Sequence, residues 1–232
     1  MALKINKINI IFIVIAVVIT AAIVIKIIRY RPSERFYYSA SVCAPSTFPV
    51  YVRELYFLTG NNETVHVDTE DVNYFKSDWK KDHHFPETTE PQLLPQKLVL
   101  KYASFREGSF YNDTIVLPFH QLKSTCDSLL AGKQGVDIHY RGQTKKGFVF
   151  LVGIANNGNI IVWLKDDVSA IEIARTKIKA KPPGDNDTYW GEKMSASAYL
   201  EDRFSLLGDS LKTLIRSGYD ADASYIDSAA SH

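Results

Sequence analysis

The pattern of apolar positions opens with one continuous run, residues 8–28, which only Asn9, Thr20 and Lys26 interrupt. As a helix rising about 1.5 Å per residue, such a run reaches roughly 30 Å, the thickness of the hydrocarbon core of a bilayer. A helix also pairs its backbone N–H and C=O groups internally, as lipid requires. The run therefore predicts one N-terminal transmembrane helix, with residues 1–31 as the anchor and its flanks.

A cleaved signal is the alternative interpretation of this run. Ala21 and Ala22 offer the small residues of a signal-peptide exit, but the apolar run continues for six further residues beyond them. A lipoprotein signal needs a cysteine directly after the run, whereas the first cysteine is Cys43. An uncleaved anchor is therefore favoured.

After residue 32 the pattern changes to short β-rich runs bounded by turn residues. Strands are predicted over residues 35–42, 50–58, 97–105, 109–117, 136–140, 147–154, 159–164 and 168–180. The alternation in 50–58 is weak because Arg53 and Glu54 break it, and the prediction there rests on β-branched and aromatic content. Short links, including one with Asn157-Gly158, favour hairpins and hence antiparallel pairing.

Two amphipathic helices are expected in the body. One begins at Pro118, which suits a first helical turn, and ends at Gly132; the other spans residues 197–216. The predicted fold class is α+β, mainly antiparallel β in a sheet or a sandwich, with these two helices and the preceding transmembrane helix. Residues 32–216 form one β-rich domain, and the small, acidic tail, 217–232, is expected to be disordered.

The charge is divided unevenly along the chain. Five of the 27 basic residues and none of the 26 acidic ones lie within residues 1–31. The rest of the chain therefore carries 22 basic and 26 acidic residues, a net charge of −4. Because no basic stripe is present, we expect no nucleic-acid partner.

The long charged stretch 68–95 holds the only group of candidate metal ligands that the sequence suggests. Asp78, Asp82, His83 and His84 have suitable donors, but adjacent histidines on an extended chain point to opposite sides and the intervening lysines repel a cation. A solvated loop is the favoured interpretation. No signature of a nucleophile elbow, a nucleotide-binding loop or a zinc protease occurs. We therefore predict no metal, no cofactor and no enzymatic activity.

The remaining candidates concern cysteines and aromatic residues. Cys43 and Cys126 either form one disulfide in an oxidising compartment or are two buried thiols, and burial is slightly favoured. Trp79 in the charged loop, and Tyr189 with Trp190 beside an acidic loop, are candidates for a protein interface, although a packed loop explains the latter pair more simply.

Three segments resemble the bacterial domain-of-unknown-function family 2931. They are SVCAPSTFPVYVRELYF (41–57), LVLKYASFREGSFYNDTIVLP (98–118) and VGIANNGNIIVWL (152–164), and the likeness extends over about residues 35–180. The resemblance implies an exported, envelope-attached protein, since many relatives look like lipoproteins. This chain lacks the lipid-attachment cysteine, so the apolar helix is expected to replace the lipid anchor.

The side of the membrane on which the body lies is open from the charges alone. Lys4 and Lys7 precede the helix and Lys26, Arg29, Arg31 and Arg35 follow its core, which favours a cytoplasmic body, whereas a short N-terminal tail favours the opposite. The resemblance favours a periplasmic body on the bacterial inner membrane.

The resulting hypothesis is a non-enzymatic, single-pass protein whose body binds a protein partner. One version is an immunity protein against a secreted antibacterial effector; a structural or assembly factor of the envelope, and an unrecognised hydrolase or metal-dependent enzyme, are the alternatives.

Overall fold

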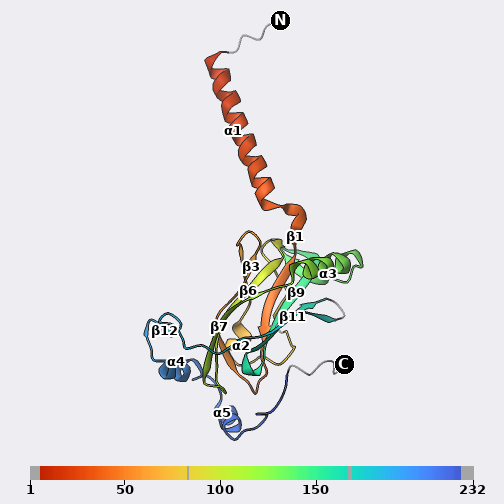
Figure 1. Cartoon of the computed structure of the whole chain (residues 1–232). Coiled ribbons are helices and arrows are strands. Elements are labelled where there is room, and N and C mark those ends of the chain that lie inside the picture. Colours follow the sequence, from red (N-terminus) through yellow and green to blue (C-terminus); the bar gives the residue numbers. More distant parts are fainter. Residues whose placement is uncertain (1–5, 83, 167–168, 226–232) are drawn as a thin grey trace. The chain divides into compact units, whose positions relative to one another are not determined.

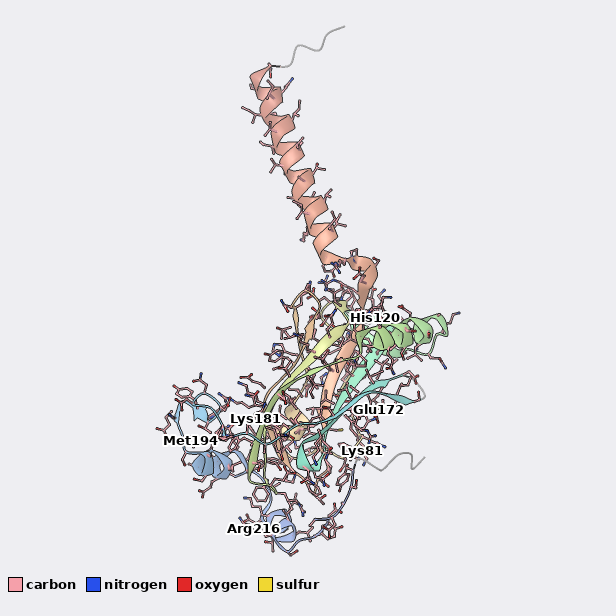
Figure 2. The ribbon with its side chains drawn as sticks, viewed as in Figure 1. Lys81, His120, Glu172, Lys181, Met194 and Arg216 are labelled. Carbon is pink, nitrogen blue, oxygen red and sulfur yellow. The ribbon has the colours of Figure 1, made fainter. Side chains whose placement is uncertain are left out.

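The computed structural model describes residues 6–82, 84–166 and 169–225, and it divides into two units, Met1–Arg35 and Phe36–His232. The first unit holds α1 (Lys7–Tyr30) and the short 3-10 helix η1 (Pro32–Glu34). Asn6 caps α1 by accepting the Asn9 amide, and the Thr20 hydroxyl donates to the Ala16 carbonyl within the helix. The apolar side chains of α1 project outward on every side (Figure 2), and by length and composition the helix is sufficient to cross a membrane.

The second unit is built on two sheets (Figure 1). One runs in the order β11-β10-β9-β2, with β8 also paired to β9, and the other runs in the order β4-β3-β6-β7. The strands of the first sheet are β2 (Tyr38–Cys43), β8 (Val136–Tyr140), β9 (Gln143–Ile154), β10 (Asn159–Lys165) and β11 (Ala170–Lys177). Those of the second are β3 (Val50–Thr59), β4 (Thr64–His66), β6 (Pro95–Ser104) and β7 (Ser109–Val116).

The main core lies between the two sheets. The Phe57 ring of β3 and the Phe150 ring of β9 face each other with their centres 5.4 Å apart, and the Tyr38 ring lies 5.0 Å from Phe150. Alternate residues of β6 and β9, among them Leu98, Leu100 and Val152, join this cluster. The α+β, mainly antiparallel prediction is confirmed, and the arrangement is that of a sandwich.

Strand β9 is buried on both faces. Leu151 points away from the main core and packs with Cys43, Ile161 and Trp163 in a second cluster, which the half-buried Trp79 covers. The neighbour of β9 on the side away from β10 is β2, which pairs with it in parallel. This parallel pair departs from the antiparallel pattern because its strands are separated by about half of the chain, so no short link constrains their direction.

The broken alternation in the predicted strand 50–58 has a structural cause. The pairing of β3 with β6 shifts register between Val52 and Glu54, which indicates a β-bulge. Consequently Val52 before the bulge and Leu55 after it both point into the core, although period two would put them on opposite faces. Arg53 is the residue that the bulge displaces from the regular register.

The first predicted body helix is confirmed as α3 (Phe119–Ala131), capped by Pro118 and Gly132, and it packs against β9. The single helix predicted over 197–216 is wrong: the chain forms α4 (Ala196–Arg203) and α5 (Asp209–Arg216) instead. The Ser205 hydroxyl donates to the Asp202 carbonyl, and Gly208 caps α5, so the chain turns between the two helices. This turn buries Phe204 together with Leu207.

Short elements interrupt the stretches predicted to be irregular. They are α2 (Glu70–Asn73), β5 (Gln92–Leu93), η2 (Asn156–Gly158), β12 (Tyr189–Trp190) and β13 (Glu192–Lys193). The single strand predicted over 35–42 is divided into β1 (Arg35–Phe36) and β2. Figure 1 places β12 and α4 together at one end of the body and α3 at the opposite end.

Candidate protein-binding surface

Two aromatic residues are presented to solvent by the small hairpin of β12 and β13. Trp190 pairs with Glu192 across the turn, and Gly191 between them has a φ of +74°, a conformation that favours glycine. The Trp190 side chain is 51% exposed, and Tyr189 is exposed to a similar degree. Tryptophan and tyrosine are among the residue types that contribute most of the binding energy at protein interfaces, and here both are half-exposed.

Two arginines hold this pair in place. The guanidinium carbon of Arg203 lies 4.0 Å from the centre of the Trp190 ring, and that of Arg53 lies 5.3 Å from it. Arg53 also donates from Nη2 to the Tyr189 carbonyl at 2.9 Å. These cation–π and hydrogen-bond contacts fix the indole against the body. We call Arg53, Tyr189, Trp190 and Arg203 the Trp190 surface.

Arg203 is itself held in place by hydrogen bonds to Asp202 and Tyr51. Its side chain is only 13% exposed, it donates from Nε to Asp202 at 2.8 Å, and it donates from Nη1 to the Tyr51 hydroxyl at 3.3 Å. Burial acts to lower the pKa of Arg203, but the hydrogen bonds to Asp202 and Tyr51 outweigh it and raise that pKa. The guanidinium therefore stays charged beneath Trp190.

The helix that carries Arg203 is anchored to the body by apolar contacts. The Ser195 hydroxyl caps α4 by accepting the Ala198 amide at 3.2 Å. Tyr199 and Phe204 are buried with Ala103 of β6, and Met194 lies beside this cluster at the start of α4 (Figure 2). A surface built on packed elements holds its geometry better than one built on a loop alone.

The third aromatic candidate, Trp79, lies in a different environment. Its ring packs edge-on against Trp163, with centres 5.3 Å apart, and against Tyr225, with centres 5.7 Å apart. Trp79 thus closes the second cluster and is covered by the C-terminal segment, whereas Tyr189 and Trp190 belong to the Trp190 surface. The structure does not bring the three candidate interface residues into one patch.

The described part of the tail that was expected to be disordered, residues 217–225, contacts the body. Asp220 accepts hydrogen bonds from the Thr47 hydroxyl and the Tyr225 hydroxyl, both at 2.5 Å. These donors lower the pKa of Asp220. The Tyr225 ring also packs on Phe48. Composition does not reveal these contacts, because they depend on two residues, Asp220 and Tyr225, that meet partners distant in sequence. Residues 226–232 lie outside the described residues.

The candidate metal ligands have other partners. Asp78 pairs with Lys81 at 2.9 Å, Asp82 accepts the Ser41 hydroxyl at 2.8 Å, and His84 Nδ1 lies 3.5 Å from an Asp68 carboxylate oxygen. His83 lies outside the described residues. Within 6–82, 84–166 and 169–225, no three His, Cys, Asp or Glu side chains gather as a metal centre would require.

Both cysteines are free, buried thiols, and the structure contains no disulfide between them. Cys43 belongs to the second cluster and Cys126, on α3, to the main core. Burial raises the pKa of each thiol to about 12. At neutral pH both are therefore protonated and unreactive.

The fold and the surface together define a class of protein: an N-terminal apolar helix followed by an α+β body of two packed, mostly antiparallel sheets. The chain belongs to the family described as Protein of unknown function (DUF2931), whose model matches residues 27–209. The match confirms the resemblance found in the sequence and includes all four residues of the Trp190 surface. No curated protein and no solved structure matches the chain.

Proposed function

We propose that this chain is a single-pass protein of the bacterial inner membrane whose periplasmic body binds a protein partner and performs no catalysis. The observation that carries the proposal is the Trp190 surface. Its half-exposed indole is held by two arginines, one of them nearly buried. Tryptophan, tyrosine and arginine are the residues most enriched among those that dominate binding energy at protein interfaces.

Membrane anchoring is supported by α1. It is apolar over its whole circumference, and its one internal hydroxyl is bonded to its own backbone. A cleaved signal sequence has the same composition, so the proposal is tested by the length of the mature chain. Mass spectrometry of the protein purified from membranes is expected to find the whole apolar run, residues 8–28, intact; a chain that begins at or after residue 23 contradicts anchoring by this helix.

The orientation of the body is tested with reporters fused after His232. An exported reporter that is active only in the periplasm is expected to work, and a fluorescent protein that folds only in the cytoplasm is expected to stay dark. The opposite pair of results contradicts the periplasmic body and supports the count of flanking charges instead.

One concrete version of the proposal is an immunity protein that neutralises an effector delivered into the envelope; the alternative is an envelope assembly factor. An effector gene beside this gene favours the first version, and envelope-assembly genes there favour the second.

Partner binding is tested by co-purification of the tagged full chain from its native host. The expected result is a stoichiometric partner that is retained by Val116→Ala and lost with Trp190→Ala. Val116 is a matched control because it is 74% exposed and lies on β7, outside the Trp190 surface. Equal recovery of a partner with both variants contradicts the assignment of this surface.

A further inference from the structure

A groove of about 1130 Å³ lies on the body at the ends of the two sheets, outside the Trp190 surface. One wall is the start of β2, at Tyr38, Ser39 and Ala40, and another is β4 with the residues that follow it. The segment 84–92 and the end of β8 complete the lining. A groove of this volume accommodates several residues of an extended chain.

The residues that line the groove carry an excess of negative charge. Five carboxylates face one guanidinium and three imidazoles: Glu63, Asp68, Glu70, Glu87 and Glu90 against Arg141 and His66, His84 and His139. An excess of negative charge along a groove attracts a cationic ligand. Charge complementarity therefore identifies the occupant as a cation.

The backbone of the walls favours an extended occupant. β2 and β4 are the terminal strands of their sheets, and a terminal strand presents backbone donors and acceptors along its outer edge. The chain itself pairs with β2 at one end of the groove, where the Asp68 amide donates to the Ala40 carbonyl at 2.8 Å. The segment after His84 pairs in the same way with β8, where the His139 amide donates to the Pro86 carbonyl at 2.8 Å.

Two side chains add to this picture. Ser39 lines the groove, is only 6% exposed, and its hydroxyl has no hydrogen-bond partner among the described residues. It lies on the face of β2 opposite to Tyr38 and Ala40, which join the core. A buried hydroxyl without a partner is costly, and a ligand group offers one. The exposed Phe85 ring lies 5.9 Å from the ring of His139, which lines the groove, and offers an aromatic contact.

We propose that this groove binds an extended, lysine- or arginine-rich segment of a partner protein as an added β-strand. The proposal rests on the proposed function, a protein-binding body, and states the chemistry of the segment bound. The backbone of the added strand pairs with the outer edge of β4, and alternate cationic side chains reach the carboxylates.

The test measures binding of defined peptides to the full chain in nanodiscs. The probe is a fluorescent, end-capped peptide of alternating lysine and threonine. Its matched competitors are an alternating glutamate–threonine peptide, a lysine peptide with proline at every second position, and spermine. The expected result is saturable binding of the lysine–threonine probe, with competition at least about 10-fold weaker from each of the others. Competition by spermine or the proline peptide at the same concentration overturns the added strand, and competition by the glutamate peptide overturns the cation preference.

Variants locate the binding. The double substitution Glu87→Gln with Glu90→Gln is expected to weaken binding of the lysine–threonine probe by at least about 5-fold, because it removes two carboxylates from the exposed lip of the groove. Glu172→Gln is the matched control, since Glu172 pairs with Arg175 on β11 (Figure 2 labels Glu172) and lies outside the groove. Equal weakening by both changes, or none by either, overturns the assignment. If the probe fails to bind while a Trp190-dependent partner is still recovered, the groove proposal alone is refuted.

Discussion

Phe204→Ala tests the packing at the turn that separates α4 from α5. Phe204 is 1% exposed, and its ring centre lies 5.5 Å from that of Phe75 and 5.3 Å from that of Phe105. Removing the ring leaves a cavity that its neighbours fill only in part, and such substitutions cost about 3–5 kcal/mol. For a body of this size each kcal/mol lowers the melting temperature by about 2–4 °C, so we expect a fall of about 6–20 °C.

The matched control is Leu206→Ala. Leu206 lies two residues away in the same turn but is 71% exposed, so its truncation is expected to change the free energy of unfolding by less than about 0.5 kcal/mol. Both variants are compared with the parent as full chains in detergent micelles, by circular dichroism during heating. Similar losses for the two variants, or a larger loss for Leu206→Ala, would refute the turn and its aromatic cluster.

Three further predictions concern thiols, the tail and a strained turn. Cys43 and Cys126 are expected to resist a thiol reagent at pH 8 until the protein unfolds. Their pKa is about 12 in the folded protein and 9.0 ordinarily. The two thiols therefore stabilise the fold below pH 9, and this contribution is lost as the pH rises toward 12. The folded pKa of Asp220 is lowered, so its contribution holds above the ordinary value of 3.8 and is lost as the pH falls through the folded pKa; Asp220→Asn is expected to speed hydrogen exchange over residues 217–225 at neutral pH. Gly158→Ala is expected to destabilise more than Gly191→Ala in urea unfolding. Both glycines have φ near +75°, which costs a larger residue about 1–2 kcal/mol, but only at Gly158 does an added Cβ lie 2.2 Å from a backbone oxygen.

Each of these has a clear contrary result. Rapid labelling of either thiol in the folded protein contradicts its burial. Unchanged exchange in the Asp220→Asn variant means that the tail is held by contacts other than this carboxylate. Equal losses of unfolding free energy in the two glycine variants would show that the backbone near Gly158 moves away from an added Cβ at no cost in stability.

Local signals were sufficient to predict much of the fold. Pro118 and Gly132 marked the ends of α3, and the short links after Ser104 and Ile154 identified the β6–β7 and β9–β10 hairpins. These features depend on residues close together in sequence. Gly208 followed by Asp209 also carried a local signal, a helix cap, but the repeating apolar residues on both sides of it favoured one continuous helix instead.

What could not be predicted depends on residues distant in sequence. The bulge at Val52 exists only in relation to the register of β6, so the sequence shows it merely as weak alternation. The Trp190 surface was found in part, because its aromatic residues are adjacent, whereas Arg53 meets Tyr189 from 136 positions away. The acidic groove depends on which strands end the two sheets, and local periodicity in the sequence does not predict the order of strands in a sheet.

The central claim, that the Trp190 surface docks a protein partner, is tested most directly by photocross-linking in intact cells of the native host. A photoreactive phenylalanine analogue is placed at Trp190 in one full-length chain and at the exposed control Val116 in another. The account predicts a discrete, higher-mass adduct from position 190 and none from position 116. The absence of an adduct at 190, or the same adduct from both positions, contradicts it.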